Sequence, residues 1–406
     1  MTIEATVPPA VSPTGPLAGP PAGPGPLAGP PAGSASAVAS WPELIGALLA
    51  RESLDSARTA WAMDQIMAGA ATPAQIAGFA VALRAKGETP AEIGGLIAAM
   101  RAHAAPLRIP DEIRARAVDT CGTGGDRSNT VNLSTMAALV VAGAGVPVIK
   151  HGNRAASSAC GSADLLAELG VAIDLPPAGV EACLRAAGIA FCFARIFHPA
   201  MRHVGGPRAE IGVPTAFNIL GPLTNPAEPG AQAVGVADAR LAPVVAQVLA
   251  DRGTRALVFR GDDGLDELTP TTTSTIWVIP GGQPSAAGEA AGQTAAPPRR
   301  EQFDPRDVGI HVPDIAVLRG ADAPHNAAVT RALLAGEPGP VRDTVLLAAA
   351  ASLVAAAGPT DAAITEQIAA ALPRAAHAID SGAAAAVLDR WTDASQAAAA
   401  AAAITR

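Results

Sequence analysis

From residue 117 onward, short apolar runs alternate with stretches of helical length, and this alternation constrains the fold more than any other feature. The runs that we expect to be strands are AVDTC, VPVIK, IAFCFA, AVGVAD, RALVFRG and TIWVI. Between them lie helical patterns such as LSTMAALVVAGAG and LAPVVAQVLADRG. The alternation predicts an α/β domain with a mainly parallel central sheet covered by helices. Functional groups are then expected on loops at the carboxyl ends of the strands.

The segment before this domain reads as a small all-α helical domain over residues 41–110. Ser40, Ser53, Thr72 and Thr89 each precede an apolar-periodic run, as N-terminal helix signals do. Four short helices with tight connections are predicted, and we expect helices around 197–216 to join them. The larger α/β domain is predicted to cover residues 111–393.

Three segments stand apart in composition. Residues 1–40 are rich in Pro, Gly and Ala and contain the octet PLAGPPAG twice, which predicts a disordered tail. Residues 280–302 read as a loop insertion, and residues 394–406 as an Ala-rich C-terminal tail whose Ala run at 397–403 is expected to form a frayed helix.

Composition excludes several classes of protein. The net charge is −8 and the chain has seven Phe, four Trp and no Tyr, so a nucleic-acid partner is not expected. The four cysteines form no CxxC pair, which argues against a disulfide framework or a zinc cluster. No strongly apolar stretch of 18 residues and no basic n-region are evident, so we expect no membrane association and a cytoplasmic protein.

A glycine-rich loop follows the first expected strand, with the sequence Asp119-Thr-Cys-Gly-Thr-Gly-Gly-Asp126. Such a loop before a helix can bind an anion through backbone N–H groups. Arg127 breaks the dinucleotide-binding fingerprint, and no P-loop is present. Asn129, Thr130, Asn132, Ser134 and Thr135 follow and could contact phosphate oxygens or Mg²⁺, although simple helix capping remains an alternative.

A second polar loop follows the strand VPVI and runs from Lys150 to Ser158 as KHGNRAASS, with GSAD at 161–164. Lys150 is one of only two lysines in a chain with 26 arginines, so a compact ammonium is favoured there. Packing alone does not explain this group of polar residues.

Two further segments carry charged candidates. Arg208 could hold a carboxylate through two parallel hydrogen bonds. Asp266 and Glu267 follow the strand RALVFR, and adjacent carboxylates at a strand end suit Mg²⁺ completed by substrate phosphates. A solvated acidic turn is the alternative for the second segment.

Taken together, these motifs resemble those of the anthranilate phosphoribosyltransferases of tryptophan biosynthesis. GTGGD, NLST, KHGNRAASS with GSAD, HPAM, FNILGPLTNPA and DGLDE occur here in the order of that family, and the resemblance covers residues 41–390. It implies transfer of phosphoribosyl from 5-phosphoribosyl 1-diphosphate to the amine of anthranilate, with release of pyrophosphate. It also implies a homodimer through the helical domain and Mg²⁺, two ions per subunit.

The resemblance also implies site residues. The diphosphate donor is expected to contact Gly122, Gly125, Asp126, Thr130, Asn132, Leu133, Ser134, Thr135, Lys150, His151, Gly152, Asn153, Arg154, Ala155, Ala156, Ser157, Ser158 and Ser162. Anthranilate is expected at Gly122, Asn153 and Arg208, and the metal at Ser134, Asp266 and Glu267. Lys150 would act electrostatically, and His151 is a candidate for proton removal with no general base assigned.

The sequence departs from the family pattern at Arg195, Pro207, Pro214 and Ala348, which puts the anthranilate entrance in doubt. Two alternatives remain open at this point. One is an enzyme like the pyrimidine nucleoside phosphorylases, which share this architecture. The other is a non-catalytic, nucleic-acid-binding relative, which the acidic composition opposes.

Overall fold

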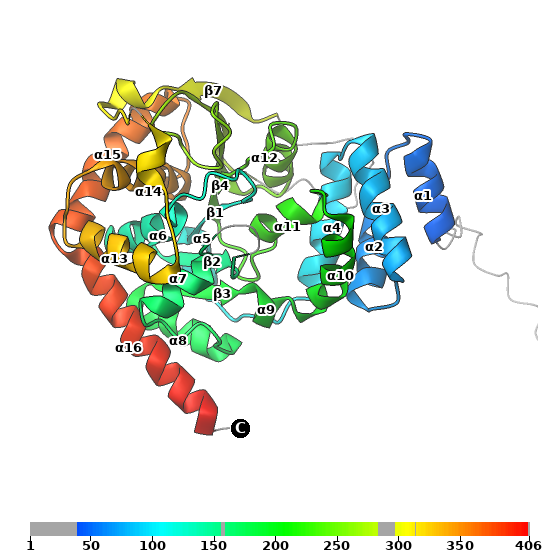
Figure 1. Cartoon of the computed structure of the whole chain (residues 1–406), viewed down its shortest axis with the longest axis horizontal. Coiled ribbons are helices and arrows are strands. Elements are labelled where there is room, and N and C mark those ends of the chain that lie inside the picture. Colours follow the sequence, from blue (N-terminus) through cyan, green and yellow to red (C-terminus); the bar gives the residue numbers. More distant parts are fainter. Residues whose placement is uncertain (1–38, 156–158, 283–296, 313, 405–406) are drawn as a thin grey trace, which may run out of the picture. The chain divides into compact units, whose positions relative to one another are not determined.

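The structure is a computed structural model that describes residues 39–155, 159–282, 297–312 and 314–404 (Figure 1). Most of the predicted 1–40 tail, residues Ala156, Ser157 and Ser158, and the middle of the 280–302 insertion lie outside these ranges.

The four predicted N-terminal helices are present as α1 (Trp41–Leu49), α2 (Ser56–Met67), α3 (Pro73–Lys86) and α4 (Pro90–Ala102). Ser40, Thr72 and Thr89 cap α1, α3 and α4 and form capping boxes with Glu43, Gln75 and Glu92. Helix α2 is capped by Asp55, two residues after the Ser53 signal.

Two later helices, α10 (Arg202–Ile211) and α11 (Phe217–Leu223), contribute to the same apolar core as this bundle. Helix α10 contacts α3, and α11 contacts α4. The chain therefore returns to the helical part, with α10 and α11, after strands β1, β2 and β3 of the sheet.

The described residues form a seven-stranded sheet in the order β3-β2-β1-β4-β5-β6-β7. The strands are β1 (Val118–Gly122), β2 (Val148–Gly152), β3 (Ile189–Phe193), β4 (Ala231–Gly235), β5 (Arg255–Gly261), β6 (Ser274–Ile279) and β7 (Arg299–Phe303). The first five pair in parallel, whereas β6 and β7 are antiparallel additions. The predicted fold class, a helical domain with a mainly parallel α/β domain, is confirmed.

Strand β7 contradicts the prediction that residues 280–302 are entirely a loop. It is an edge strand in which only Phe303 is fully buried, so RREQF shows no apolar run that would have marked it.

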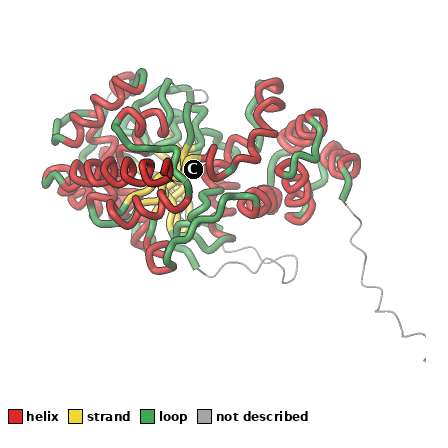
Figure 2. Tube along the Cα trace, turned by 90° about the horizontal axis from the view of Figure 1, so that it is seen from below, coloured by secondary structure: helices red, strands yellow, loops and turns green. Residues whose placement is uncertain are grey.

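Helices cover both faces of the sheet, as Figure 2 shows, and alternate residues of β5 belong to different cores. Leu257 and Phe259 face the core that contains α6 (Leu133–Gly143) and α14 (Pro340–Ala357), while Val258 faces the core shared with α12 (Ala242–Asp251). The remaining helices are α5 (Asp111–Arg116), α7 (Ser162–Glu168), α8 (Pro177–Ala187), α9 (Ala194–Phe197), η1 (Pro199–Met201), η2 (Pro305–Val308), η3 (Ile315–Leu318), α13 (Ala323–Leu334), α15 (Ile364–Asp380) and α16 (Ala383–Ile404).

Two C-terminal helices differ from the sequence predictions. Helix α14 is long and apolar enough to cross a membrane by length and composition, although no such stretch was predicted, and most of it is buried in the core. Helix α16 continues to Ile404, so the Ala run at 397–403 is helical as expected, but the helix is continuous with residues 383–396 rather than a separate tail. The buried Ser395 hydroxyl accepts a hydrogen bond from the backbone N–H of Ala172 at 2.9 Å, so this end is anchored.

Candidate active site

The acidic segment after β5 is packed directly against the ends of β1 and β4. A Cβ atom added at Gly235 would lie 1.6 Å from the backbone oxygen of Asp266, and one added at Gly122 would lie 2.3 Å from its Oδ2. Both strands end in glycine because the Asp266 backbone and carboxylate occupy the space that a side chain would need. Gly124 N–H donates to Oδ2 of Asp266 at 2.6 Å, which fixes the carboxylate on the glycine-rich loop.

The carboxylates gathered here are difficult to ionise together. Burial, followed by repulsion from Asp126, raises the pKa of Asp266 to about 7. Burial, and then the neighbouring Asp266, raises the pKa of Glu267 well above its usual range, while Lys150 opposes this shift. The Glu267 carboxylate also accepts a hydrogen bond from the backbone N–H of Ser134. The structure therefore brings the three predicted metal-site residues, Ser134, Asp266 and Glu267, to one place.

The chemistry of this donor set fits Mg²⁺. Carboxylate and hydroxyl oxygens are hard ligands, and a cation would relieve the repulsion that raises both pKa values. Among the described residues, no three His, Cys, Asp or Glu side chains converge closely enough to hold a metal ion by themselves. That arrangement suits Mg²⁺, which commonly takes one or two carboxylates and completes its shell with substrate phosphates and water.

Lys150 connects three elements behind this acidic group. It lies at the middle of β2 and is 2% exposed, and its Nζ donates to the backbone oxygen of Thr120 on β1. The same Nζ lies 3.2 Å from Oγ of Ser134 on α6. Lys150 therefore places a positive charge between the glycine-rich loop and the start of α6.

The start of α6 is left without a side-chain cap. Asn132 occupies the N-cap position but makes no capping hydrogen bond, so ordinary helix capping does not explain it. Its Nδ2 instead donates to the backbone oxygen of Cys160 at 2.9 Å, and its Oδ1 accepts from Nδ2 of Asn326 at 2.8 Å. The hydroxyl of the neighbouring Thr135 is buried and has no partner among the described residues. The first turn of α6 thus offers polar groups that the protein does not satisfy.

The loop between β1 and α6 has an unusual backbone. Gly124 and Gly125 have positive φ of 67° and 88°, and Arg127 and Asn129 also adopt positive φ of 62° and 49°. Asp126 Oδ1 accepts from the backbone N–H of Ser128 at 3.2 Å. Thr130 then pairs with Arg319 in an antiparallel bridge, which leads the chain into Leu133 at the start of α6.

The loop after β2 is held by Asp164 of α7. Its carboxylate accepts from the backbone N–H groups of Ala155 and Gly161 and from Arg154, and these bonds lower the pKa of Asp164 even though burial opposes them. Ser162 Oγ donates to the backbone oxygen of Asn153 at 3.2 Å. A Cβ atom at Gly152 would lie 2.3 Å from that Ser162 oxygen, so this strand also ends in a glycine imposed by close approach.

His151 has a buried position beneath the site. Its Nδ1 lies 2.9 Å from the backbone oxygen of Gly221, and its ring centroid lies 5.1 Å from that of His198. Burial, followed by the nearby His198, lowers the pKa of His151 to about 3. The imidazole is therefore neutral at pH 7 and weakly basic, which disfavours the proton-removal role considered from the sequence.

Arg208 lies on α10, in the helical part, and burial lowers the pKa of its guanidinium. No hydrogen bond or ion pair between the described residues joins it to Gly122 or Asn153. Contacts among the described residues thus connect Gly122, Asp126, Ser134 and Lys150 to the Asp266–Glu267 segment, but none links Arg208 to it, and Ala156, Ser157 and Ser158 lie outside the described residues.

Sequence reasoning missed two residues that organise the site. Asn326 on α13 holds Asn132, and Gly235 makes room for Asp266. Asn326 is the sixth asparagine of the chain, far from the other five in sequence, and no local motif marked it. Gly235 ends the run AVG, and the close approach that requires it is visible only in three dimensions.

Comparison with family models defines the class of this protein. Residues 114–385 match the glycosyl transferase family, a/b domain, and residues 42–104 match the glycosyl transferase family, helical bundle domain. The chain therefore belongs to the glycosyl transferases that combine a helical bundle domain with an a/b domain.

Individual relatives narrow the class. The chain is 61% identical to anthranilate phosphoribosyltransferase of Acidothermus cellulolyticus over 359 residues, which is 88% of this chain and 96% of the relative. Its identity to the enzyme of that name from Saccharopolyspora erythraea is 57% over 353 residues, or 87% and 95% of the two chains. The chain therefore belongs to the anthranilate phosphoribosyltransferase family, as its motifs indicated.

Solved structures agree with this assignment. The crystal structure of the Thermus thermophilus anthranilate phosphoribosyltransferase has a TM-score of 0.76 at 39% identity and covers 87% of this chain and 99% of its own. The Saccharomyces cerevisiae enzyme in complex with PRPP and Mg has a TM-score of 0.76 at 25% identity, with 88% and 98% coverage.

Proposed function

We propose that this chain transfers the phosphoribosyl group of 5-phosphoribosyl 1-diphosphate to the amine of anthranilate and releases pyrophosphate, in tryptophan biosynthesis. The observation that carries the proposal is the group formed by Lys150, Ser134, Asp266 and Glu267 at the carboxyl edge of a parallel sheet. The relatives that share this sequence over nearly the whole chain carry the corresponding enzyme name.

The main chemical task is to stabilise charge on the departing pyrophosphate. We propose that the N–H groups of the glycine-rich loop, the uncapped first turn of α6 and the residues of the 150–162 segment bind the diphosphate donor. Lys150 stays fixed by Thr120 and adds a positive charge without having to reorganise. The amine of anthranilate is a neutral nucleophile at pH 7, so no strong base is required, and His151 serves to pack the base of the site.

Mg²⁺ is the metal that we propose for the Ser134, Asp266 and Glu267 group, with two ions per subunit. When bound, it supplies positive charge that offsets the charge of the donor diphosphate. The protein's own contribution is to hold the Asp266 carboxylate against Gly122 and Gly124 and the Asp266 backbone against Gly235, so that this carboxylate need not move during the reaction.

The anthranilate site is proposed to involve Gly122, Asn153 and Arg208. Substitution Arg208→Ala is expected to raise the KM for anthranilate at least about 10-fold, since a charge-assisted hydrogen bond contributes roughly 1.5–3 kcal/mol. The KM for the donor should change little, and steady-state kinetics with each substrate varied in turn measures both values. If both KM values rise equally, Arg208 does not bind anthranilate.

We propose that the protein is a cytoplasmic homodimer that associates through the helical domain. We assign residues 41–110 to this domain and residues 111–393 to the α/β domain. Leu49 on α1 and Val81 on α3 are 72% and 44% exposed, and these two helices pack against one another. The double change Leu49→Asp with Val81→Asp is expected to shift the mass in sedimentation equilibrium from dimer to monomer. A monomeric parent protein would exclude the dimer, and a variant that remains dimeric would place the interface elsewhere.

One assay tests the reaction itself. Protein, anthranilate, 5-phosphoribosyl 1-diphosphate and Mg²⁺ are mixed, and the loss of anthranilate fluorescence is followed together with the release of pyrophosphate. Replacing the two substrates by thymidine and phosphate tests the pyrimidine nucleoside phosphorylase alternative, which the named relatives disfavour. Turnover of thymidine, with none of anthranilate, would overturn the proposal.

A further inference from the structure

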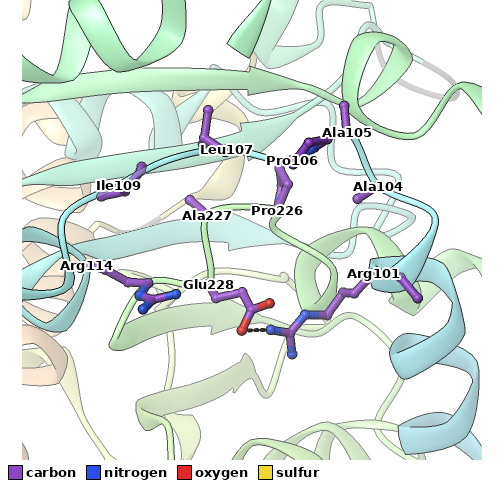
Figure 3. A pocket seen from close by; sticks show the side chains of 11 residues that line it. Arg101, Ala104, Ala105, Pro106, Leu107, Ile109, Arg114, Pro226, Ala227 and Glu228 are labelled. Atoms are coloured by element: carbon purple, nitrogen blue, oxygen red, sulfur yellow. Dashed lines mark ion pairs between the residues drawn. The ribbon is translucent and has the colours of Figure 1, made fainter. Parts of the chain in front are cut away.

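A pocket lies near the amino ends of the parallel strands, whereas the candidate active site lies at their carboxyl ends. Its volume is about 320 Å³, and its lining comes from the end of α4, the linker to α5, and the loop before β4 (Figure 3). Gly230 N–H donates to the backbone oxygen of Arg114, and Ala231 N–H to that of Ala117, so this pocket adjoins the amino ends of β1 and β4. The two sites are separated by the length of strand β1, roughly 13 Å at about 3.3 Å per residue.

The walls of this pocket differ in chemistry. Figure 3 shows Arg114, Glu228 and Arg101 along one side, with Leu107 and Ile109 on the linker opposite. A ligand in this space would therefore meet guanidinium groups on one side and an apolar surface on the other.

The positive charge around the pocket exceeds the negative charge that the described residues supply. Arg101 forms an ion pair with Glu228, and Arg114 with Asp111, whose side chain is 85% exposed. A third guanidinium, that of Arg252, is nearly buried and donates from Nη1 to the backbone oxygen of Leu223 at 2.9 Å. Among the residues that line the pocket, two arginines, Arg101 and Arg114, thus face one carboxylate, that of Glu228. The Asp111 carboxylate that pairs with Arg114 lies largely in water, where its charge is well screened.

Two details indicate that the ion pair with Glu228 does not fully satisfy Arg101. The Nε of Arg101 is buried and has no hydrogen-bond partner among the described residues. Burial, and then the proximity of Arg252 and Arg114, lowers the pKa of Arg101 to about 10. An unsatisfied N–H of a buried guanidinium and mutual repulsion between arginines are both relieved when an anion binds.

We propose that this pocket binds a small anion bearing a carboxylate or a phosphate, held by Arg101 and Arg114 and covered by the Leu107–Ile109 side of the linker. The ligand would touch both the end of α4 in the helical part and the loop that leads into β4. This site is separate from the donor and anthranilate sites and does not depend on the proposed reaction.

Isothermal titration calorimetry of the full chain with malonate and, separately, with inorganic phosphate tests the proposal. The informative variant is Arg114→Gln, and its matched control is Arg116→Gln, an exposed arginine on the same short helix α5 that does not line the pocket. Binding of either anion at the candidate active site contributes equally to the parent, Arg114→Gln and Arg116→Gln proteins, so a difference between the two variants reports on the pocket. Circular dichroism verifies that both variants fold.

The expected result is that at least one anion binds the parent protein and that Arg114→Gln weakens this binding about 10-fold or more, while Arg116→Gln leaves it within about twofold. Tighter binding of malonate would assign the site to carboxylates, and tighter binding of phosphate to phosphorylated ligands. Absence of binding by both anions, equal loss in the two variants, or unchanged binding in Arg114→Gln would each overturn the proposal.

Discussion

Substitution Gly235→Ala tests whether the sheet edge positions the acidic segment. The new methyl group would lie 1.6 Å from the backbone oxygen of Asp266, whereas ordinary contact begins at 3.4 Å. The two backbones must therefore separate by about 1.8 Å, because neither partner is a flexible side chain that can turn away. Gly235 is not one of the residues that we propose to bind substrate or metal, and its expected effect is on the position of Asp266 alone.

A displacement of that size is large for a catalytic site. A misplacement of about 1 Å can cost on the order of 10²-fold in rate, so we expect kcat to fall by at least that factor. The Mg²⁺ concentration needed for half-maximal rate should rise as well, because Asp266 carries the bond to Gly124 and belongs to the proposed metal site. Stability should fall by about 1–3 kcal/mol, the usual cost of inserting a methyl group into a packed region.

The measurement is the anthranilate fluorescence assay over a range of Mg²⁺ concentrations, with thermal unfolding followed by circular dichroism. Gly94→Ala is the matched control, because Gly94 lies inside α4 and an added Cβ there meets nothing within 4 Å. That variant should keep its activity and gain about 0.5–1 kcal/mol in stability. Activity of Gly235→Ala within threefold of the parent, with unchanged Mg²⁺ dependence, would refute the idea that close packing at β4 sets the position of Asp266.

The other predictions concern charge and positioning at the same site. The double change Asp266→Asn with Glu267→Gln should reduce kcat by at least about 10²-fold with the fold intact by circular dichroism, and near-normal turnover would place the metal elsewhere. The folded-state pKa of Asp266 is raised from 3.8 to about 7, so between about pH 4 and pH 7 the unfolded chain loses this proton while the folded protein keeps it. The free energy of unfolding of the metal-free protein should therefore decrease as the pH rises through this range. Added Mg²⁺ should therefore raise the melting temperature more at pH 8 than at pH 5.5, and a shift independent of pH in scanning calorimetry would contradict this. Asn326→Ala should raise the KM for the donor several-fold by releasing Asn132, whereas an effect on stability alone would limit Asn326 to a structural role.

Much of the site could be predicted from the sequence because its residues lie on loops directly after strands. The apolar runs that correspond to β1, β2 and β5 indicate where these loops begin. Because the strands are parallel, their carboxyl ends, and the loops that follow, lie on the same side of the sheet. Lys150 stood out because lysine is rare in this chain. The contact of Lys150 with Ser134 then follows from the pairing of β1 with β2 and the crossover through α6.

What could not be predicted depends on tertiary contacts without a local signal. Strand β7 is an edge strand of mostly polar residues, and its pairing with β6 rather than its own pattern makes it a strand. The Ala run at 397–403 predicts a frayed helix, because alanine is the strongest helix former but offers little apolar surface for packing. The tertiary contact of Ser395 with Ala172, which anchors the segment, left no local signal. Asn326 reaches Asn132 across 194 residues of sequence, a distance that no motif spans.

The buried acids indicate how stability and function are connected in this fold. Asp119 lies on the interior strand β1, whereas Asp266 lies against the carboxyl ends of β1 and β4 with Glu267 next to it, and burial is the first cause of the raised pKa in all three acids. For Asp119, at about 6, the opposing partners Lys150, Asn225 and His151 come from the protein itself. For Asp266 only backbone hydrogen bonds oppose the raised pKa, for Glu267 Lys150 and a backbone hydrogen bond oppose it, and in both acids repulsion from neighbouring carboxylates adds to the shift. Among the described residues, the fold thus directs a lysine and hydrogen-bond donors at Asp119 and no second carboxylate. Asp266 and Glu267 instead face other carboxylates, and this repulsion is the physical reason to expect a cation at their position.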